Sequence, residues 1–93
     1  MAETADIVVI GAGIVGCSIA YHLAVRGGAQ VVVLERDLIC SGATGKSGGG
    51  IRQLFATELN VRLSLESLRM FQRMPDELGI DPEFRPVGYL FLA

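Results

Sequence analysis

An uncharged β-branched run that leads into three spaced glycines limits the folds open to this 93-residue chain. The run Ile7–Ile10 is typical of a strand buried on both faces of a parallel sheet. Gly11, Gly13 and Gly16 follow in the G-x-G-x-x-G spacing. The apolar pattern after them predicts a helix over residues 14–26. This order predicts an α/β fold that starts with a strand, a tight turn and a helix.

A second apolar run, residues 30–34, ends at the acidic residue Glu35. The Gly27-Gly28 pair before it is a common way to end a helix. Glu35 follows Gly16 by 19 residues, close to the separation of about 20 at which a carboxylate binds ribose hydroxyls. The unit therefore predicts a site for the adenosine diphosphate half of a dinucleotide, without a 2′-phosphate. The alternative, a glycine-rich turn in an ordinary hairpin, leaves this spacing as coincidence.

Each glycine of the motif has its own expected role. Gly11 allows a sharp turn off the strand, Gly13 lets a pyrophosphate approach the backbone, and Gly16 lets the helix pack closely on the strand. Free amides at the helix start carry a partial positive charge of about half a unit, which favours phosphate.

Composition and charge exclude several classes of protein. The chain is 51% hydrophobic with a net charge of −2 and no block of like charges, so it is globular and nothing indicates nucleic acid. Residues 7–25 are uncharged, but their glycines and change of period favour strand and helix over a membrane span. The acidic amino end lacks a signal peptide's basic region, and two cysteines are too few for a disulfide framework. We expect a cytoplasmic location.

Residues 41–50 form a second glycine-rich segment, with five glycines in ten residues. A flexible linker would explain the composition. The segment begins six residues after Glu35, however, near the strand ends where ligands bind in open α/β sheets. We therefore favour a cofactor loop.

An amphipathic pattern predicts a helix over residues 58–74, with Thr57 as its cap and Pro75 as its end. Residues 87–93 are expected to form another strand. The only histidine, His22, falls on the first helix without a second ligand nearby, so we expect a hydrogen-bonded helical histidine and no metal site.

Four segments of the chain together resemble a known family. They are the two glycine segments, Val-Val-Leu-Glu-Arg at residues 32–36 and Pro-Val-Gly-Tyr-Leu-Phe-Leu at residues 86–92. The family is that of the FAD-dependent amine and amino-acid oxidoreductases, which are D-amino-acid oxidase-like. The closest likeness is to the sarcosine oxidase β-subunit and L-proline dehydrogenase β types. The resemblance implies an incomplete Rossmann-like FAD-binding domain over residues 1–86 and the first strand of a truncated substrate domain over 87–93. The chain is then a fragment, or a partner chain completes it.

The resemblance also implies which residues contact FAD. The first glycine segment would line the pyrophosphate, the acid and the arginine after it would hold the adenosine, and the second segment would reach the phosphates, ribityl chain and isoalloxazine. These residues are Gly11, Gly13, Ile14, Val15, Gly16, Glu35, Arg36, Ser41, Thr44, Ser47, Gly48, Gly49 and Gly50. No histidine lies in the second segment, so a covalent FAD link made there by some relatives is not available in it.

Arg52 matches an arginine that pairs with the substrate carboxylate in monomeric sarcosine oxidase-type members. A guanidinium suits a carboxylate, although a surface ion pair is the alternative. The implied reaction oxidises the CH–NH bond of an amino acid or N-methyl amino acid, with hydride passing to the flavin and the fragment alone inactive. Two alternatives stay open: an NAD-binding Rossmann dehydrogenase, disfavoured by the second glycine segment and Arg36, and a non-catalytic FAD-fold protein that serves in assembly.

Overall fold

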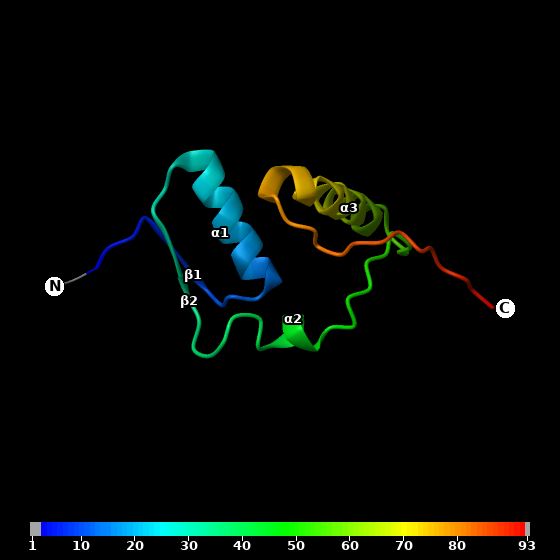
Figure 1. Ribbon diagram of the computed structural model, residues 1–93, viewed down its shortest axis with the longest axis horizontal. Helices are drawn as coiled ribbons and strands as arrows, with labels where there is room; N and C mark the ends of the chain where they lie inside the picture. The colour runs from blue at the N-terminus through cyan, green and yellow to red at the C-terminus, as the bar shows by residue number, and fades with distance from the viewer. Residues whose placement is uncertain (1–2, 93) are drawn as a thin grey trace. The chain divides into compact units, whose positions relative to one another are not determined.

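The computed structural model describes residues 3–92 and divides the chain into two compact units. The amino-terminal unit comprises residues 1–49 and the carboxyl-terminal unit comprises residues 50–93. Figure 1 shows the two strands and three helices of the described residues along the chain.

The amino-terminal unit is a strand–helix–strand unit made of β1 (Ile7–Ile10), α1 (Ile14–Gly27) and β2 (Val31–Leu34). The strands are parallel, with Ile7 opposite Val31 and Ile10 opposite Leu34. This arrangement confirms the predicted α/β fold with a parallel sheet.

The ends of α1 and β2 each differ by one residue from the sequence prediction. The helix includes Gly27, and Gly28 ends it in the left-handed conformation with φ of 61°. Gln30 precedes β2, where its N–H donates to Asp6 Oδ2 at 2.8 Å and its carbonyl accepts from the Asp6 N–H at 3.0 Å. Gln30, which the sequence pattern included in the second strand, therefore pairs with Asp6 just before β2 begins.

One face of the sheet packs on α1 and the other is apolar and exposed. Val9 reaches α1, because its Cγ1 lies 3.4 Å from where a Cβ on Gly16 would stand. On the opposite face, Val8 is 52% exposed and Ile10 is 86% exposed. Ala12, in the turn between β1 and α1, is the one apolar residue among residues 3–92 that is buried.

The second glycine segment contains a short helix, α2 (Ala43–Lys46), where the composition predicted only a loop. A Cβ on Gly45 would lie 2.2 Å from the carbonyl oxygen of Cys40, so this turn of helix closes only on a glycine. Cys40 itself has a φ of 62°, in the left-handed region that non-glycine residues rarely occupy. The segment is thus a folded turn and differs from a flexible linker.

The carboxyl-terminal unit is built on α3 (Glu58–Leu78). Thr57 caps it as predicted, because its side chain accepts from the Asn60 N–H at 3.3 Å. The prediction that Pro75 ends this helix is wrong, since the helix continues to Leu78 and ends at Gly79 with φ of 71°. A proline conflicts with the turn before it, whereas the residues after it keep their N–H groups. The Gly79 N–H donates to the Pro75 carbonyl at 3.0 Å and closes the last turn.

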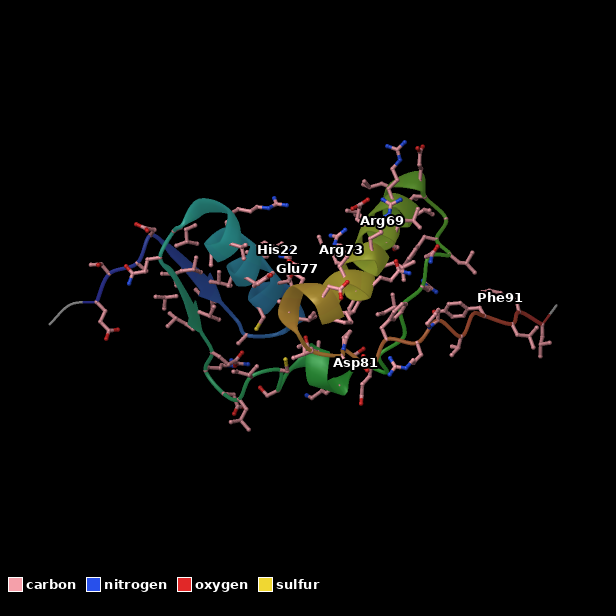
Figure 2. All side chains as sticks on the ribbon, turned by 45° about the horizontal axis from the view of Figure 1, so that its top comes forward. His22, Arg69, Arg73, Glu77, Asp81 and Phe91 are labelled. Atoms are coloured by element: carbon pink, nitrogen blue, oxygen red, sulfur yellow. The ribbon has the colours of Figure 1, made fainter. Side chains whose placement is uncertain are left out.

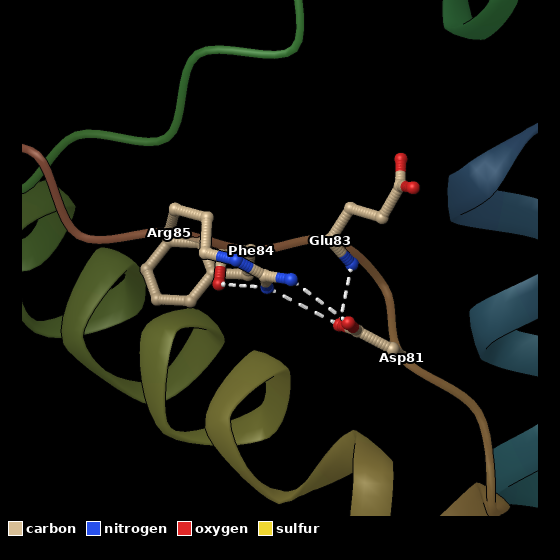
Figure 3. A network of polar contacts seen from close by, with 4 residues as sticks. All are labelled: Asp81, Glu83, Phe84 and Arg85. Carbon is tan, nitrogen blue, oxygen red and sulfur yellow. Dashed lines mark hydrogen bonds and ion pairs between the residues drawn. The ribbon is translucent and has the colours of Figure 1, made fainter.

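The chain after α3 folds back within the same unit. Figure 3 shows Arg85 paired with Asp81, with Nη2 and Oδ2 2.9 Å apart, while the Glu83 N–H donates to Asp81 Oδ1 at 2.8 Å. The Phe84 ring lies 6.0 Å from that of Phe71 on α3, measured between centroids. These contacts hold residues 81–85 in a turn beside the helix.

The predicted strand over residues 87–93 is not formed at residues 87–92, and Ala93 lies outside the described residues. Gly88 has a φ of 76°, which breaks the extended conformation, and the sheet of the described residues contains only β1 and β2. Phe91 is 72% exposed in this run (Figure 2), stacked on Tyr89 at 5.9 Å. A strand needs a neighbour for its hydrogen bonds, so the β-rich composition alone does not produce one here.

His22 lies on α1 and is hydrogen-bonded there, as predicted (Figure 2). Its Nδ1 donates to the Ser18 carbonyl at 2.7 Å, and its ring meets that of Tyr21 edge-on at 5.1 Å. Within residues 3–92, no group of three or more metal-ligating side chains comes together. No helix in that range is long and apolar enough to cross a membrane.

Candidate cofactor site

A cavity of about 420 Å³ lies at the carboxyl ends of β1 and β2 in the amino-terminal unit. Its walls come from the end of β1, the glycine turn, the start of α1, the end of β2 and the segment that leads into α2. The lining residues are Val9, Ile10, Gly11, Gly13, Val15, Gly16, Ile19, Glu35, Cys40, Ser41, Gly42, Ala43 and Thr44. The fold therefore brings the first glycine motif, the acidic residue and the start of the second glycine segment to one place.

Gly11 and Gly16 shape the turn in the way their spacing predicts. Gly11 has a φ of 106°, and its N–H donates to the Leu34 carbonyl at 2.8 Å, which extends the sheet pairing into the turn. A Cβ on Gly16 would lie only 2.0 Å from the Gly11 carbonyl oxygen. The helix thus touches the turn backbone directly, and a side chain at either position would change the geometry of the cavity.

Thr44 reaches across from α2 to the amino end of α1. Its Oγ1 accepts from the Ile14 N–H at 3.0 Å, and a Cβ on Gly13 would lie 2.9 Å from the same oxygen. Gly13 is the cap residue of α1 and has no side chain to accept from these amides. A hydroxyl oxygen from the second segment therefore lies where a helix amino end attracts phosphate oxygens.

Glu35 binds the glycine turn with one carboxylate oxygen and its own strand end with the other. Oε1 accepts from the Ala12 N–H at 2.9 Å and Oε2 from the Asp37 N–H at 3.0 Å. The Ala12 amide, then that of Asp37, lowers the pKa of Glu35, and the charge of Arg36 adds to this effect. An ionised carboxylate has about four acceptor positions, so two remain for ribose hydroxyls.

Some residues that the resemblance assigned to FAD do not line this cavity. The residues absent from its described lining are Ile14, Arg36, Ser47 and 48–50, and the Ser47 hydroxyl accepts from the Gly49 N–H at 3.1 Å. Arg52 belongs to the carboxyl-terminal unit, where its guanidinium carbon lies 4.5 Å from the centroid of the Phe55 ring. The cofactor contacts of these residues stay predictions.

Sequence reasoning missed the part that Cys40 plays in the cavity. Its backbone N–H donates to the Ala12 carbonyl at 3.0 Å, so the contact leaves no trace in the side-chain pattern. Gly42 and Ala43 also line the cavity, and their place between the predicted Ser41 and Thr44 is the signal that could have found them.

The residues present fit the phosphates and ribose of a dinucleotide. A turn with glycines on both sides of the buried Ala12 leads into the helix amides, a hydroxyl lies at the helix start, and a carboxylate lies at the end of the second strand. This combination defines a dinucleotide-binding strand–helix–strand unit.

The chain belongs to the FAD dependent oxidoreductase family, which matches residues 6–93. This membership confirms the family resemblance and the Rossmann-like α/β class, and it confirms FAD as the cofactor that the resemblance implied.

Named relatives match nearly the whole chain. A Xenopus laevis FAD-dependent oxidoreductase domain-containing protein 1 is 45% identical, covering 98% of this chain and 20% of its own length. The human mitochondrial sarcosine dehydrogenase is 37% identical, over 98% of this chain and 10% of its own length. The rat mitochondrial dimethylglycine dehydrogenase is 34% identical, over 98% of this chain and 11% of its own length. The chain thus spans between a tenth and a fifth of these relatives, and no solved structure gives a significant match.

Proposed function

We propose that this chain holds the adenosine and pyrophosphate of FAD in an oxidoreductase that acts on the CH–NH bond of an amino acid or N-methyl amino acid. The observation that carries the cofactor site is that Glu35 bonds the centre of the glycine turn, at Ala12, and Thr44 bonds its helix end, at Ile14. The relatives named as sarcosine and dimethylglycine dehydrogenases support the donor class.

The chain's own residues bind and orient the cofactor. Gly11, Gly13 and Gly16 leave their positions without side chains, so that the phosphates can approach the amides of α1. Glu35 accepts from the ribose, and the Thr44 hydroxyl bonds a phosphate oxygen. FAD supplies the hydride-accepting chemistry when bound.

Arg52 is proposed to recognise the substrate carboxylate. The Arg52 guanidinium carbon lies over the Phe55 ring, 4.5 Å from its centroid, and the N–H donors of a guanidinium lie along its planar edge. That edge is the part that pairs with a carboxylate in two parallel hydrogen bonds. The division into residues 1–86 and 87–93, completion of the fold by further sequence or a partner chain, inactivity of the fragment alone and a cytoplasmic location stay predictions.

The cofactor proposal is tested by Gly13→Val in the whole protein that contains these residues. The branched side chain displaces Thr44 Oγ1, which lies 2.9 Å from the Cβ position, and fills the phosphate space. The purified wild type is expected to carry flavin absorbance that denaturation releases, and Gly13→Val to lack it. Gly27→Ala is the matched control, because a Cβ there meets nothing within 4 Å. Equal flavin content in all three proteins would contradict the proposal.

The substrate proposal is tested by Arg52→Met, which keeps the length of the side chain and removes its charge. Losing a bidentate charged contact lowers kcat/KM for the amino acid roughly 30- to 1,000-fold, mainly through KM. An amine without the carboxylate serves as control substrate and is expected to be oxidised equally by both proteins. Unchanged amino-acid turnover, or loss of FAD, would assign Arg52 a structural role and favour the non-catalytic alternative.

A further inference from the structure

We infer that Glu35 is also a positioning residue, which holds the phosphate-binding turn in shape before any cofactor arrives. This inference rests on the proposed function, because it concerns the same site. It adds a role that ribose recognition does not require, since the contact is made to the protein's own backbone.

The peptide groups of Ala12 are held from both sides. The N–H donates to Glu35 Oε1 at 2.9 Å, and the carbonyl accepts from the Cys40 N–H at 3.0 Å. Ala12 stands between the two glycines that form the turn and is only 4% exposed. Its amide therefore has little access to water, and Glu35 is the acceptor that satisfies it.

Beyond the bonds of the Gly11 N–H to the Leu34 carbonyl and of the Cys40 N–H to the Ala12 carbonyl, few contacts fix the conformation of the turn. Gly11 and Gly13 flank Ala12, and glycine loses more backbone freedom on ordering than any other residue. The first turn of α1 contains no acidic residue, and its cap residue makes no side-chain hydrogen bond. Thr44 fixes the helix end of the turn through the Ile14 N–H. Glu35 fixes its centre.

A second bond keeps the Glu35 carboxylate in place for this task. The Asp37 N–H donates to Oε2, two residues further along the chain. The carboxylate is thus anchored at the end of β2 while it reaches 23 residues back to Ala12. One charged side chain links the end of the second strand to the turn that follows the first.

The two roles of Glu35 differ in the ligands that depend on it. If Glu35 only accepts from the ribose, its loss matters only for a nucleotide that has both ribose hydroxyls. If Glu35 also positions the turn, its loss weakens the binding of a nucleotide without these hydroxyls, because the pyrophosphate still binds to the turn. ADP and 2′,3′-dideoxy-ADP separate these cases.

The experiment titrates both nucleotides by calorimetry into the FAD-stripped whole protein and its Glu35→Ala variant. The Ala12 amide then lacks an acceptor, so affinity for the dideoxy nucleotide is expected to fall about tenfold to 100-fold. Glu35→Gln, which keeps an acceptor oxygen, is expected to recover part of it. Glu66→Ala, which removes an exposed carboxylate on α3, is the charge-matched control and is expected to leave both affinities unchanged.

A loss confined to ADP would overturn the positioning role and leave the proposed function standing. A wild type that binds neither nucleotide would overturn both. Amide hydrogen exchange in the nucleotide-free protein gives an independent readout, since a ribose contact cannot affect it. Exchange at Ala12 is expected to be fastest in Glu35→Ala and intermediate in Glu35→Gln. If Glu35→Ala does not fold, Glu35→Gln alone decides. An exchange rate of the Ala12 amide in Glu35→Gln equal to that in the wild type would overturn the inference.

Discussion

Gly16→Ala is the smallest change that tests how the amino end of α1 is placed. A methyl group at this position would lie 2.0 Å from the Gly11 carbonyl oxygen and 3.1 Å from its carbon. Real Cβ atoms essentially never come within 3.0 Å of such an atom, so the backbones must separate by about 1 Å. Both contact atoms belong to the main chain, so no side-chain rotation relieves the overlap.

The magnitude follows from the kind of overlap. Forcing extra atoms into a packed site costs about 1–3 kcal/mol of stability. The shift also moves the Gly11 carbonyl away from α1 and opens the turn on which the phosphates depend. Misplacement by about 1 Å can reduce the function of a site about 100-fold. We therefore expect FAD affinity to fall by more than the loss of stability explains.

The assay combines chemical denaturation with titration of FAD, followed by flavin fluorescence, in the whole protein. Gly27→Ala is the control, since no atom lies within 4 Å of its Cβ position and an alanine in a helix gains about 0.5–1 kcal/mol over glycine. The reasoning would be refuted if Gly16→Ala kept wild-type FAD affinity and were as stable as Gly27→Ala. The backbone would then accommodate the methyl group beside Gly11 without cost.

Two further predictions concern the polar groups of the site. Thr44→Val keeps the shape but removes the acceptor for the Ile14 N–H, so α1 is expected to lose about 1 kcal/mol, as for other helix caps, and FAD to bind more weakly. Calorimetric unfolding and FAD titration measure both, and an unchanged affinity would show that the hydroxyl does not meet the cofactor. The pKa of Glu35 is lowered in the folded chain, so its stabilising effect is complete above the usual value of about 4.3 and is lost as the pH falls through the lowered pKa. Unfolding measured from pH 6 downwards should show this loss in the wild type, and an equal loss in Glu35→Gln would contradict it.

The elements β1, α1 and β2 were predictable because their signals are local, whereas α2 was not predicted. The β-branched run fixes β1, and the spacing of Gly11 and Gly16 fixes the turn, since both glycines are required by their own backbone surroundings. Pro75 and Gly88 were misinterpreted for a related reason. A proline marks a helix end only when the following residues leave the helix, and an apolar β-rich run forms a strand only beside another strand.

The contacts that complete the site could not be predicted from the sequence. The bond from Thr44 to the Ile14 N–H joins residues 30 positions apart, and that from Glu35 to the Ala12 N–H joins residues 23 apart. Spacing rules placed Glu35 at the end of β2 and left open what else it would touch. Its contact with Ala12 depends on the turn's tertiary position, which no single-residue preference encodes.

Cys40 shows that a residue can matter for its main chain alone. Its N–H is the group that meets Ala12, while its φ of 62° is a conformation better suited to glycine or asparagine than to cysteine. Replacing its thiol should therefore be tolerated wherever the new residue accepts that conformation, and a β-branched residue should not be tolerated. The residue types tolerated at this position would then be set by the backbone conformation. A comparison based on side-chain chemistry alone would overlook that requirement.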